Sequence, residues 1–389
     1  KKELIMKLAF TLSIKNILGA KLRTFLNVFV LSFSFVVIIG LKGVMDGWDD
    51  QARRDSINWQ FGQGQLIHED YDPLDSFTIL DGKGPIPQNI SGLTSILVHQ
   101  ASIYPQGRML GATIKGIDPF QKSVLLPTKA LINSKYNYPV IIGKRMAESS
   151  KLSIGDEVLI RWRDKNGTYD ANRITVVDIF DSNVPAIDSG QIWMSIETLW
   201  QMTGLNNQAS FFIADRNYKH KSINFWKFNS QEELLKPISD LVAQKNGSQS
   251  VIYFLLLTIA LLAIFDTQVL SVFRRQSEIG TYIALGMTRQ KVIGIFTFEG
   301  SLYSVLALIL ATIYGFPLLA WFADVGFAVP PADQKMGIPI ADTIFPIFGL
   351  KLVFGTIFLV LFASTIVSFL PTRKISKLDP ILALKGKKQ

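Results

Sequence analysis

Residues 251–273 read VIYFLLLTIALLAIFDTQVLSVF, and residues 274–292, which follow directly, read RRQSEIGTYIALGMTRQKV. The only ionisable side chains in the first segment are those of Tyr253 and Asp266. A helix rises about 1.5 Å per residue, so this segment covers roughly 34 Å, enough to cross the hydrocarbon layer of a bilayer. The apolar run ends abruptly at Arg274. This contrast predicts a membrane-spanning helix followed by a polar connector.

The connector is too polar to stay in lipid, yet it is rich in helix-forming residues. Apolar Ile279, Ile283 and Met287 recur at a spacing of four, which predicts a short helix over 276–290 that lies at the membrane surface. The chain returns to an apolar run at Ile293. A basic connector between two spanning helices is expected on the cytoplasmic side by the positive-inside rule, where it is displayed to a cytoplasmic partner.

Three further apolar runs predict membrane helices over 24–45, 293–322 and 344–370, so that the chain has four with the helix at 251–273. The segments between and around them are then an interfacial amphipathic helix at 1–23, the cytoplasmic connector at 274–292, an extracytoplasmic loop at 323–343 and a cytoplasmic basic tail at 371–389. In this topology both chain termini are cytoplasmic.

Residues 46–250 have the character of a folded aqueous domain, because charge is normal and turn signals are frequent. Strands are predicted over 65–68, 108–117, 157–162, 173–180 and 211–214, helices over 144–152, 196–202 and 231–244, and a linker over 244–248. The fold class is therefore a membrane α-helical protein of four transmembrane helices, with a large mixed α/β extracytoplasmic domain inserted between helices 1 and 2.

Composition fits a mixture of membrane helices and an aqueous domain, with 48% hydrophobic residues, 18% charged residues and a mean hydropathy of +0.27. Three segments beside apolar runs, 1–24, 274–291 and 371–389, hold 16 Lys and Arg against 3 Asp and Glu. The net charge of these segments is +13, whereas that of the whole chain is +9, so the remaining residues carry a net charge of −4. Positive charge placed in this way marks topology and contact with anionic membrane lipids, and it argues against nucleic-acid binding.

Motifs for catalysis, cofactors and metals are missing from the sequence. No GxxxxGK[ST] string for a phosphate-binding loop occurs, and GxSxG and HExxH are also absent. The chain has no cysteine, and His68, His99 and His220 lie far apart without paired metal-ligand spacing. The sequence therefore predicts a non-enzymatic protein with no catalytic residue, no metal and no cofactor of its own.

Three stretches together resemble one family of membrane proteins. They are NILGAKLRTFL before the first span, RRQSEIGTYIALG at 274–286 followed by Arg289 and by Glu299-Gly300, and PTRKISKLDPILAL after the last span. This set is similar to mechanotransmission-type ABC transporter permeases, the family of lipoprotein-releasing, macrolide-exporter and cell-division permeases. Segments 62–73, 115–119 and 142–158 look most like the extracytoplasmic domain of the lipoprotein-releasing subgroup.

The resemblance implies a dimer of permeases, identical or paired with a sister chain, and two cytoplasmic ATPase subunits that bind ATP and Mg²⁺. It also implies that the connector docks into a groove of the ATPase. Arginines would pair there with acidic residues, Glu278 would accept hydrogen bonds, and apolar side chains would fill the groove. The interface residues so implied are Arg274, Arg275, Glu278, Ile279, Gly280, Ile283, Leu285, Gly286 and Arg289. The alternative is a solvated amphipathic connector with lipid-facing arginines.

Two acidic residues fall within predicted spans and are candidates for a functional or packing role, namely Asp266 and, with less weight, Glu299. Five phenylalanines of the first two spans are candidates for a cleft that takes acyl chains: Phe25, Phe29, Phe33, Phe254 and Phe265. Lipid contact or helix packing is the alternative for each of them.

The function expected from the resemblance is that of a permease subunit that transmits ATP-driven motion to the extracytoplasmic domain. Its cargo would be a lipoprotein or another amphiphile of the bacterial inner membrane. Export of macrolide-type or peptide substrates, and control of a cell-wall hydrolase without transport, stay open as alternatives. The corresponding extra partners are a periplasmic lipoprotein carrier, an outer-membrane channel or a hydrolase.

Overall fold

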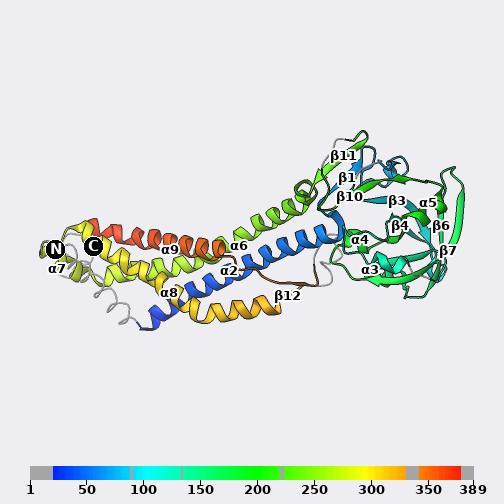
Figure 1. The fold of residues 1–389 in the computed structure, drawn as a ribbon. Coiled ribbons are helices and arrows are strands. Elements are labelled where there is room, and N and C mark those ends of the chain that lie inside the picture. Colours follow the sequence, from blue (N-terminus) through cyan, green and yellow to red (C-terminus); the bar gives the residue numbers. More distant parts are fainter. Residues whose placement is uncertain (1–20, 88–90, 133–134, 220–222, 330–340, 378–389) are drawn as a thin grey trace. The chain divides into compact units, whose positions relative to one another are not determined.

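The computed structural model describes residues 21–87, 91–132, 135–219, 223–329 and 341–377 (Figure 1). The chain divides into two compact units. The helical unit comprises Lys1–Gly47, Val242–Phe327 and Phe345–Gln389, and the sheet unit comprises Trp48–Leu241 and Ala328–Ile344. The predicted helix at 1–23 lies almost entirely outside the described residues, as do parts of the loop at 323–343 and of the tail at 371–389.

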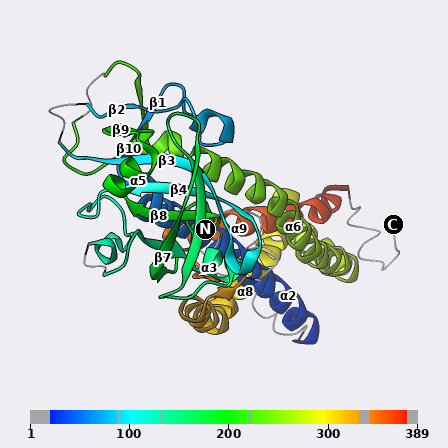
Figure 2. The ribbon, with the colours of Figure 1, turned by 90° about the vertical axis from the view of Figure 1, so that its right-hand side faces the viewer.

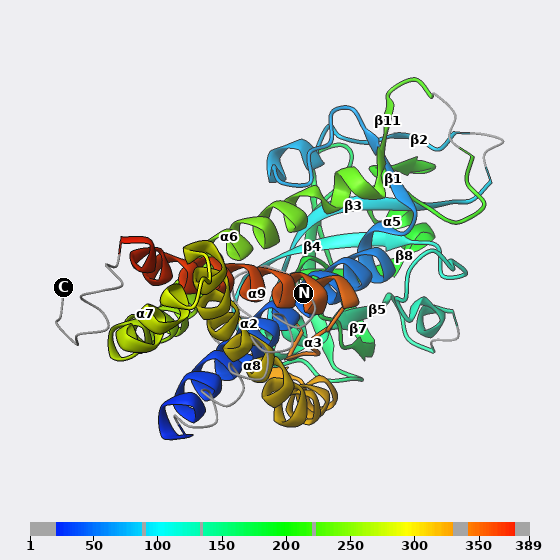
Figure 3. The same ribbon diagram turned by 90° about the vertical axis from the view of Figure 1, so that its left-hand side faces the viewer.

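Four long helices supply the helical unit, and they lie side by side in two views (Figure 1, Figure 3). They are α2 (Lys21–Ser56), α6 (Gln231–Arg274), α8 (Arg289–Val325) and α9 (Leu350–Thr372), with the short α7 (Gln276–Ala284) between α6 and α8. In the part of the chain that the structure describes, 4 helices are long and apolar enough to cross a membrane, and these are the ones. Each contains a stretch of 18 predominantly apolar residues with at most two charged ones, which is close to the length that a bilayer requires.

Small and polar side chains hold these helices close together. Asn27 of α2 donates a hydrogen bond to Thr267 of α6 over 2.5 Å, and both side chains are buried. Between α8 and α9, the Ser364 hydroxyl donates to Ser304 over 2.8 Å. A Cβ added to Gly300 would collide with Ser368 of α9, so the backbones approach as only small residues allow. Packing of this kind can stabilise helices even where lipid offers equally apolar contacts.

The sheet unit is built on a mixed sheet of nine strands within the described residues, in the order β11-β1-β10-β3-β4-β8-β5-β7-β6. Their bounds are β1 Gly64–His68, β3 Leu93–Ile103, β4 Leu110–Ile117, β5 Pro139–Gly143, β6 Glu157–Arg163, β7 Tyr169–Phe180, β8 Gln191–Ser195, β10 Phe211–Ala214 and β11 Trp226–Ser230. Figure 2 shows β3, β4 and β8 side by side. Two small pairs, β2 (Gly84–Pro85) with β9 (Gln208–Ala209) and β12 (Phe327–Ala328) with β13 (Thr343–Ile344), stand apart from this sheet.

Short helices complete the described chain. The α-helices are α3 (Lys144–Ser150), α4 (Pro185–Asp188) and α5 (Ile196–Thr203). A π-helical turn, Ile57–Phe61, follows α2, and the 3₁₀ turns are Ser76–Ile79, Pro105–Gly107, Thr128–Leu131 and Arg373–Lys377.

Strand pairing closes part of the sheet into a ring. The first half of β3 pairs with β10, whereas Ala101–Ile103 in its second half pair with Ile160–Trp162 of β6. Strands β3, β4, β8, β5, β7 and β6 therefore form a closed circuit. Strand β6 alternates strictly between exposed and buried residues, so Val158, Ile160 and Trp162 fill the ring while the residues between them face outward. This alternation places Arg161 and Arg163 on one outer surface.

Several predicted boundaries differ from the structure; the span predicted over 344–370, for example, begins at Leu350. Helix α6 starts at Gln231, so the segment 244–248 that the sequence marks as a linker lies inside a continuous helix. The polar residues there continue the helix because its hydrogen bonds are local, and a single glycine in the segment costs only about 1 kcal/mol. The connector helix predicted over 276–290 ends earlier, at Ala284, and α8 already begins at Arg289.

Candidate functional site

The connector between α6 and α8 has two sharp changes of direction. Arg275 leaves helical geometry with φ −108° and ψ 24°, which separates α6 from α7. After Ala284 the chain turns through Gly286, whose φ of +89° is a left-handed value that favours glycine. Thr288 is extended with ψ 144° and precedes the first turn of α8. The connector is therefore a compact helix and turn instead of an open loop.

Arg275 fixes the start of α7 through two carboxylates. Its Nε donates to Glu278 Oε2 over 2.7 Å, and its Nη1 donates to Glu299 Oε2 over 2.9 Å. The guanidinium also lies 4.6 Å from the ring centroid of Phe296, a cation–π distance. Because Glu299 and Phe296 belong to α8, one side chain links α7 to the next long helix.

This ion pair is mostly withdrawn from solvent. The side chains of Arg275 and Glu299 are 15% and 4% exposed, whereas that of Glu278 is 51% exposed. Burial by itself lowers the pKa of Arg275, but the charges and hydrogen bonds of Glu299 and Glu278 outweigh it and raise the pKa above its ordinary value. The arginine therefore stays charged, and both carboxylates keep a permanent partner.

An apolar cluster anchors the other face of α7. Ile279 is fully buried among Val272 of α6, Val292 and Phe296 of α8, and Ile375 of the turn after α9. Ile283 is half-buried against the same cluster, and Gly280 is buried. The apolar residues expected to fill a partner's groove thus include Ile279 as part of this chain's own core. The side chains of Ile279 and Ile283 thus turn toward this chain's own helices.

The outward face of α7 and its turn is formed by other residues of the predicted set. The side chain of Leu285 is 81% exposed. Arg274, Glu278, Gly286 and Arg289 are also exposed. The exposed set combines one apolar side chain, two arginines and one carboxylate on a rigidly held turn. Apolar and arginine side chains exposed together are also common in protein–protein interfaces.

The two acidic residues within spans have opposite surroundings. Glu299 is buried and paired with Arg275, so its cost in the membrane helix is offset by an ion pair and hydrogen bonds. Asp266 is exposed on α6, on the side away from the buried Thr267 and Gln268. Asp266, which the sequence favours over Glu299 as a functional residue, thus has fewer contacts than Glu299. The sequence does not show that Arg275 lies close to Glu299, because the two residues are 24 positions apart.

The five phenylalanines lie on outward faces of α2 and α6. Their exposed fractions range from 36% for Phe265 to 68% for Phe254, and the rings of Phe25 and Phe29 stack with centroids 6.0 Å apart. Phe33 is 51% exposed. These rings are available for contact with lipid, with another protein or with a hydrophobic ligand.

Residues 250–380 match the family model described as FtsX-like permease C-terminal. No curated protein matches the chain. Among solved structures, the chain is similar to the extracellular domain of the noncanonic ABC-type transporter YknZ from Gram-positive bacteria. The identity is 12%, the TM-score is 0.25, and the likeness covers 40% of this chain and 83% of that chain. The four apolar helices of the described residues and the match at 250–380 together show a membrane protein.

Proposed function

We propose that this chain is the permease subunit of an ABC-type transporter and that the connector receives the movement of a separate ATPase. The observation that carries the proposal is the permease match over 250–380, which includes the whole connector with its anchored α7 and exposed Leu285. The subunit would supply no chemistry itself. Mg²⁺ and ATP would be held by the partner.

The anchoring of α7 gives a physical reason for this role. A helix held only by a flexible loop would absorb a push, whereas α7 is joined to α8 by the Arg275–Glu299 pair and to α6, α8 and the turn after α9 by Ile279. A displacement of the exposed turn would therefore move the ends of the long helices. We place the chain in the inner membrane of a bacterial cell, with the connector and both termini on the cytoplasmic side.

The cargo is proposed to be a lipoprotein or similar amphiphile, handled by a pair of permeases that are identical or sister chains. The support is the row of exposed phenylalanines on α2 and α6, which presents apolar surface for acyl chains. ATP-driven motion of the connector would be passed along the long helices to the sheet unit. Cargo release would follow from that movement.

Docking at the turn can be tested with Leu285→Asp in the full-length chain. The variant should lose a co-purifying subunit that contains a phosphate-binding loop and the Mg²⁺-ATP hydrolysis that comes with it. Leu74→Asp is the matched control, because Leu74 is 95% exposed and belongs to the sheet unit. The proposal fails if Leu285→Asp keeps both the subunit and the hydrolysis at the level of the control.

A further inference from the structure

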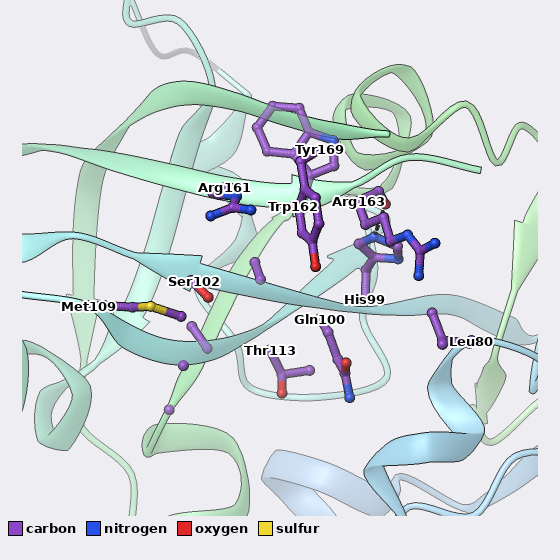
Figure 4. A pocket seen from close by; sticks show the side chains of 14 residues that line it. Leu80, His99, Gln100, Ser102, Met109, Thr113, Arg161, Trp162, Arg163 and Tyr169 are labelled. Atoms are coloured by element: carbon purple, nitrogen blue, oxygen red, sulfur yellow. Dashed lines mark hydrogen bonds between the residues drawn. The ribbon is translucent and has the colours of Figure 1, made fainter. Parts of the chain in front are cut away.

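A hollow on the outer surface of the strand ring has no role in the proposed function. It has a volume of about 490 Å³ and lies over β3, β4 and β6, on the side opposite the ring's apolar core (Figure 4). Small residues make its floor. Ser102 and Gly111 face each other across β3 and β4, and a Cβ added to Gly111 would meet nothing within 4 Å. The hollow has the size of a small-molecule site.

Two arginines and a tyrosine form one wall. Arg161 and Arg163 are two residues apart on β6, so both face the hollow, with backbone positions about 7 Å apart. The Arg161 guanidinium stacks on the Tyr169 ring at 4.1 Å, and Arg163 Nε donates to the Gly167 carbonyl over 2.8 Å. These contacts fix both guanidiniums without neutralising either one.

The charge of the hollow is therefore positive and unbalanced. None of the 14 residues that line it is acidic. Burial lowers the pKa of His99, although the hydrogen bond that its Nε2 donates to the Arg163 carbonyl over 2.7 Å acts in the opposite direction. An arginine carries five N–H donors, and the contacts above use one donor of Arg163 and none of Arg161, so most donors remain for a ligand.

The rest of the lining suits a molecule with both a polar and an apolar part. Gln100, Ser102 and Thr113 lie on the strands across from the arginines (Figure 4). The Gln100 amide nitrogen is already engaged by the Ser76 carbonyl, which leaves its oxygen as an acceptor. Met109 and Leu80 add apolar contacts at the rim, 65% and 46% exposed.

We propose that this hollow binds a small organic anion, a carboxylate or a phosphate ester with a short apolar group. The anionic oxygens would receive hydrogen bonds from Arg161 and Arg163, which are held in place before binding by Tyr169 and Gly167. The apolar group would lie against Met109 and the Tyr169 ring. This inference does not rest on the proposed transport function.

The test uses the full-length chain in nanodiscs of zwitterionic lipid, with calorimetric titration of three probes. Phenyl phosphate and benzoate carry the two candidate anionic groups on the same ring, and benzylammonium carries the opposite charge. We expect saturable binding of at least one anion and none of the cation. Arg161→Met and Arg163→Met should each weaken the anion about tenfold or more, because each removes charge-assisted hydrogen bonds.

Two further variants separate binding from folding. Gly111→Val fills the hollow with a strand-favouring residue and leaves both arginines, so it should abolish binding without lowering the melting temperature. Arg173→Met is the matched control, since Arg173 lies on β7 outside the hollow with its side chain 73% exposed. It should bind as the unmodified chain does. Absence of anion binding to the unmodified chain, or equal affinity in all four variants, would overturn the proposal.

Discussion

Replacing Glu299 of α8 with methionine should destabilise the connector helix α7 more than a substitution of any exposed residue on α7 does. The substitution keeps a long helix-forming side chain in α8 but leaves Arg275 charged, and among the described residues its remaining carboxylate partner is the half-exposed Glu278. Removal of one partner from a buried ion pair typically costs about 3 to 5 kcal/mol. Because Glu278 still compensates part of the charge, we expect about 2 to 3 kcal/mol.

Hydrogen exchange of the backbone amides in α7, followed by mass spectrometry of peptides that cover 276–288, measures this loss locally. A local readout is preferable because a chain of two units need not unfold in one step. A loss of about 2 to 3 kcal/mol corresponds to exchange that is roughly 30- to 150-fold faster. Peptides of the sheet unit should exchange at unchanged rates and serve as the internal control.

A double-mutant cycle shows whether the effect comes from the pair. With Arg275→Met added to Glu299→Met, no buried charge is left unpaired, since the one remaining carboxylate of the two, that of Glu278, is 51% exposed, and most of the protection should return. Glu278→Met alone should change exchange less than about fivefold, because the side chain of Glu278 is 51% exposed. If Glu299→Met accelerates exchange no more than Glu278→Met, the buried pair is not what holds α7.

Three other substitutions test the electrostatics of each unit. Burial lowers the pKa of Lys115 to about 8, so Lys115→Met should stabilise the sheet unit by on the order of 3 kcal/mol at pH 7. In thermal melts this gain should shrink between about pH 8 and 10.5, because in that range the unfolded chain still binds the proton that the folded chain has lost. In the unmodified chain, Arg145 Nη1 lies 2.6 Å from Oδ2 of the fully buried Asp188. Arg145→Met leaves this carboxylate without its cation and should lower the stability of the sheet unit by about 3 kcal/mol in the same melts. Asp266→Asn should leave the melting temperature of the purified chain unchanged or raised, because Asp266 is exposed; a marked drop would contradict the exposed position.

Features with a local cause in the sequence were predictable. The strands at 157–162 and 173–180 carry alternating or β-branched residues around Asn166-Gly167, and Gly167 indeed takes a left-handed φ of +86° between β6 and β7. The 11-residue β3 was missed, although its pairings with β4 and β6 close the ring. Its mixed polar and apolar pattern changes along its length because its two halves pair with different strands, β10 and β6.

The candidate site shows the same limit at the level of single side chains. The spacing of Ile279 and Ile283 revealed an apolar face, but no local signal says whether such a face meets a partner or the chain's own helices. The answer comes from Ile375, almost a hundred residues away, which lies in the same buried cluster. The role of Glu299 is likewise visible only from its ion pair with Arg275, which lies 24 residues away in the sequence.

The burial of Ile279 changes what a docking partner would have to do. If Ile279 were exposed, a partner could bind α7 through a broad apolar face and the helix could move alone. With Ile279 and Arg275 committed to α8 and its neighbours, a partner meets mainly the turn around Leu285 and the arginines beside it. A force on that turn would act on α6 and α8 together. Ile279→Ala should therefore remove about 2 to 5 kcal/mol of packing free energy between α7 and the long helices, while leaving the docking surface around Leu285 intact. The expected result is a partner that still binds but whose ATP hydrolysis no longer drives transport, and loss of binding in Ile279→Ala would contradict this division of roles.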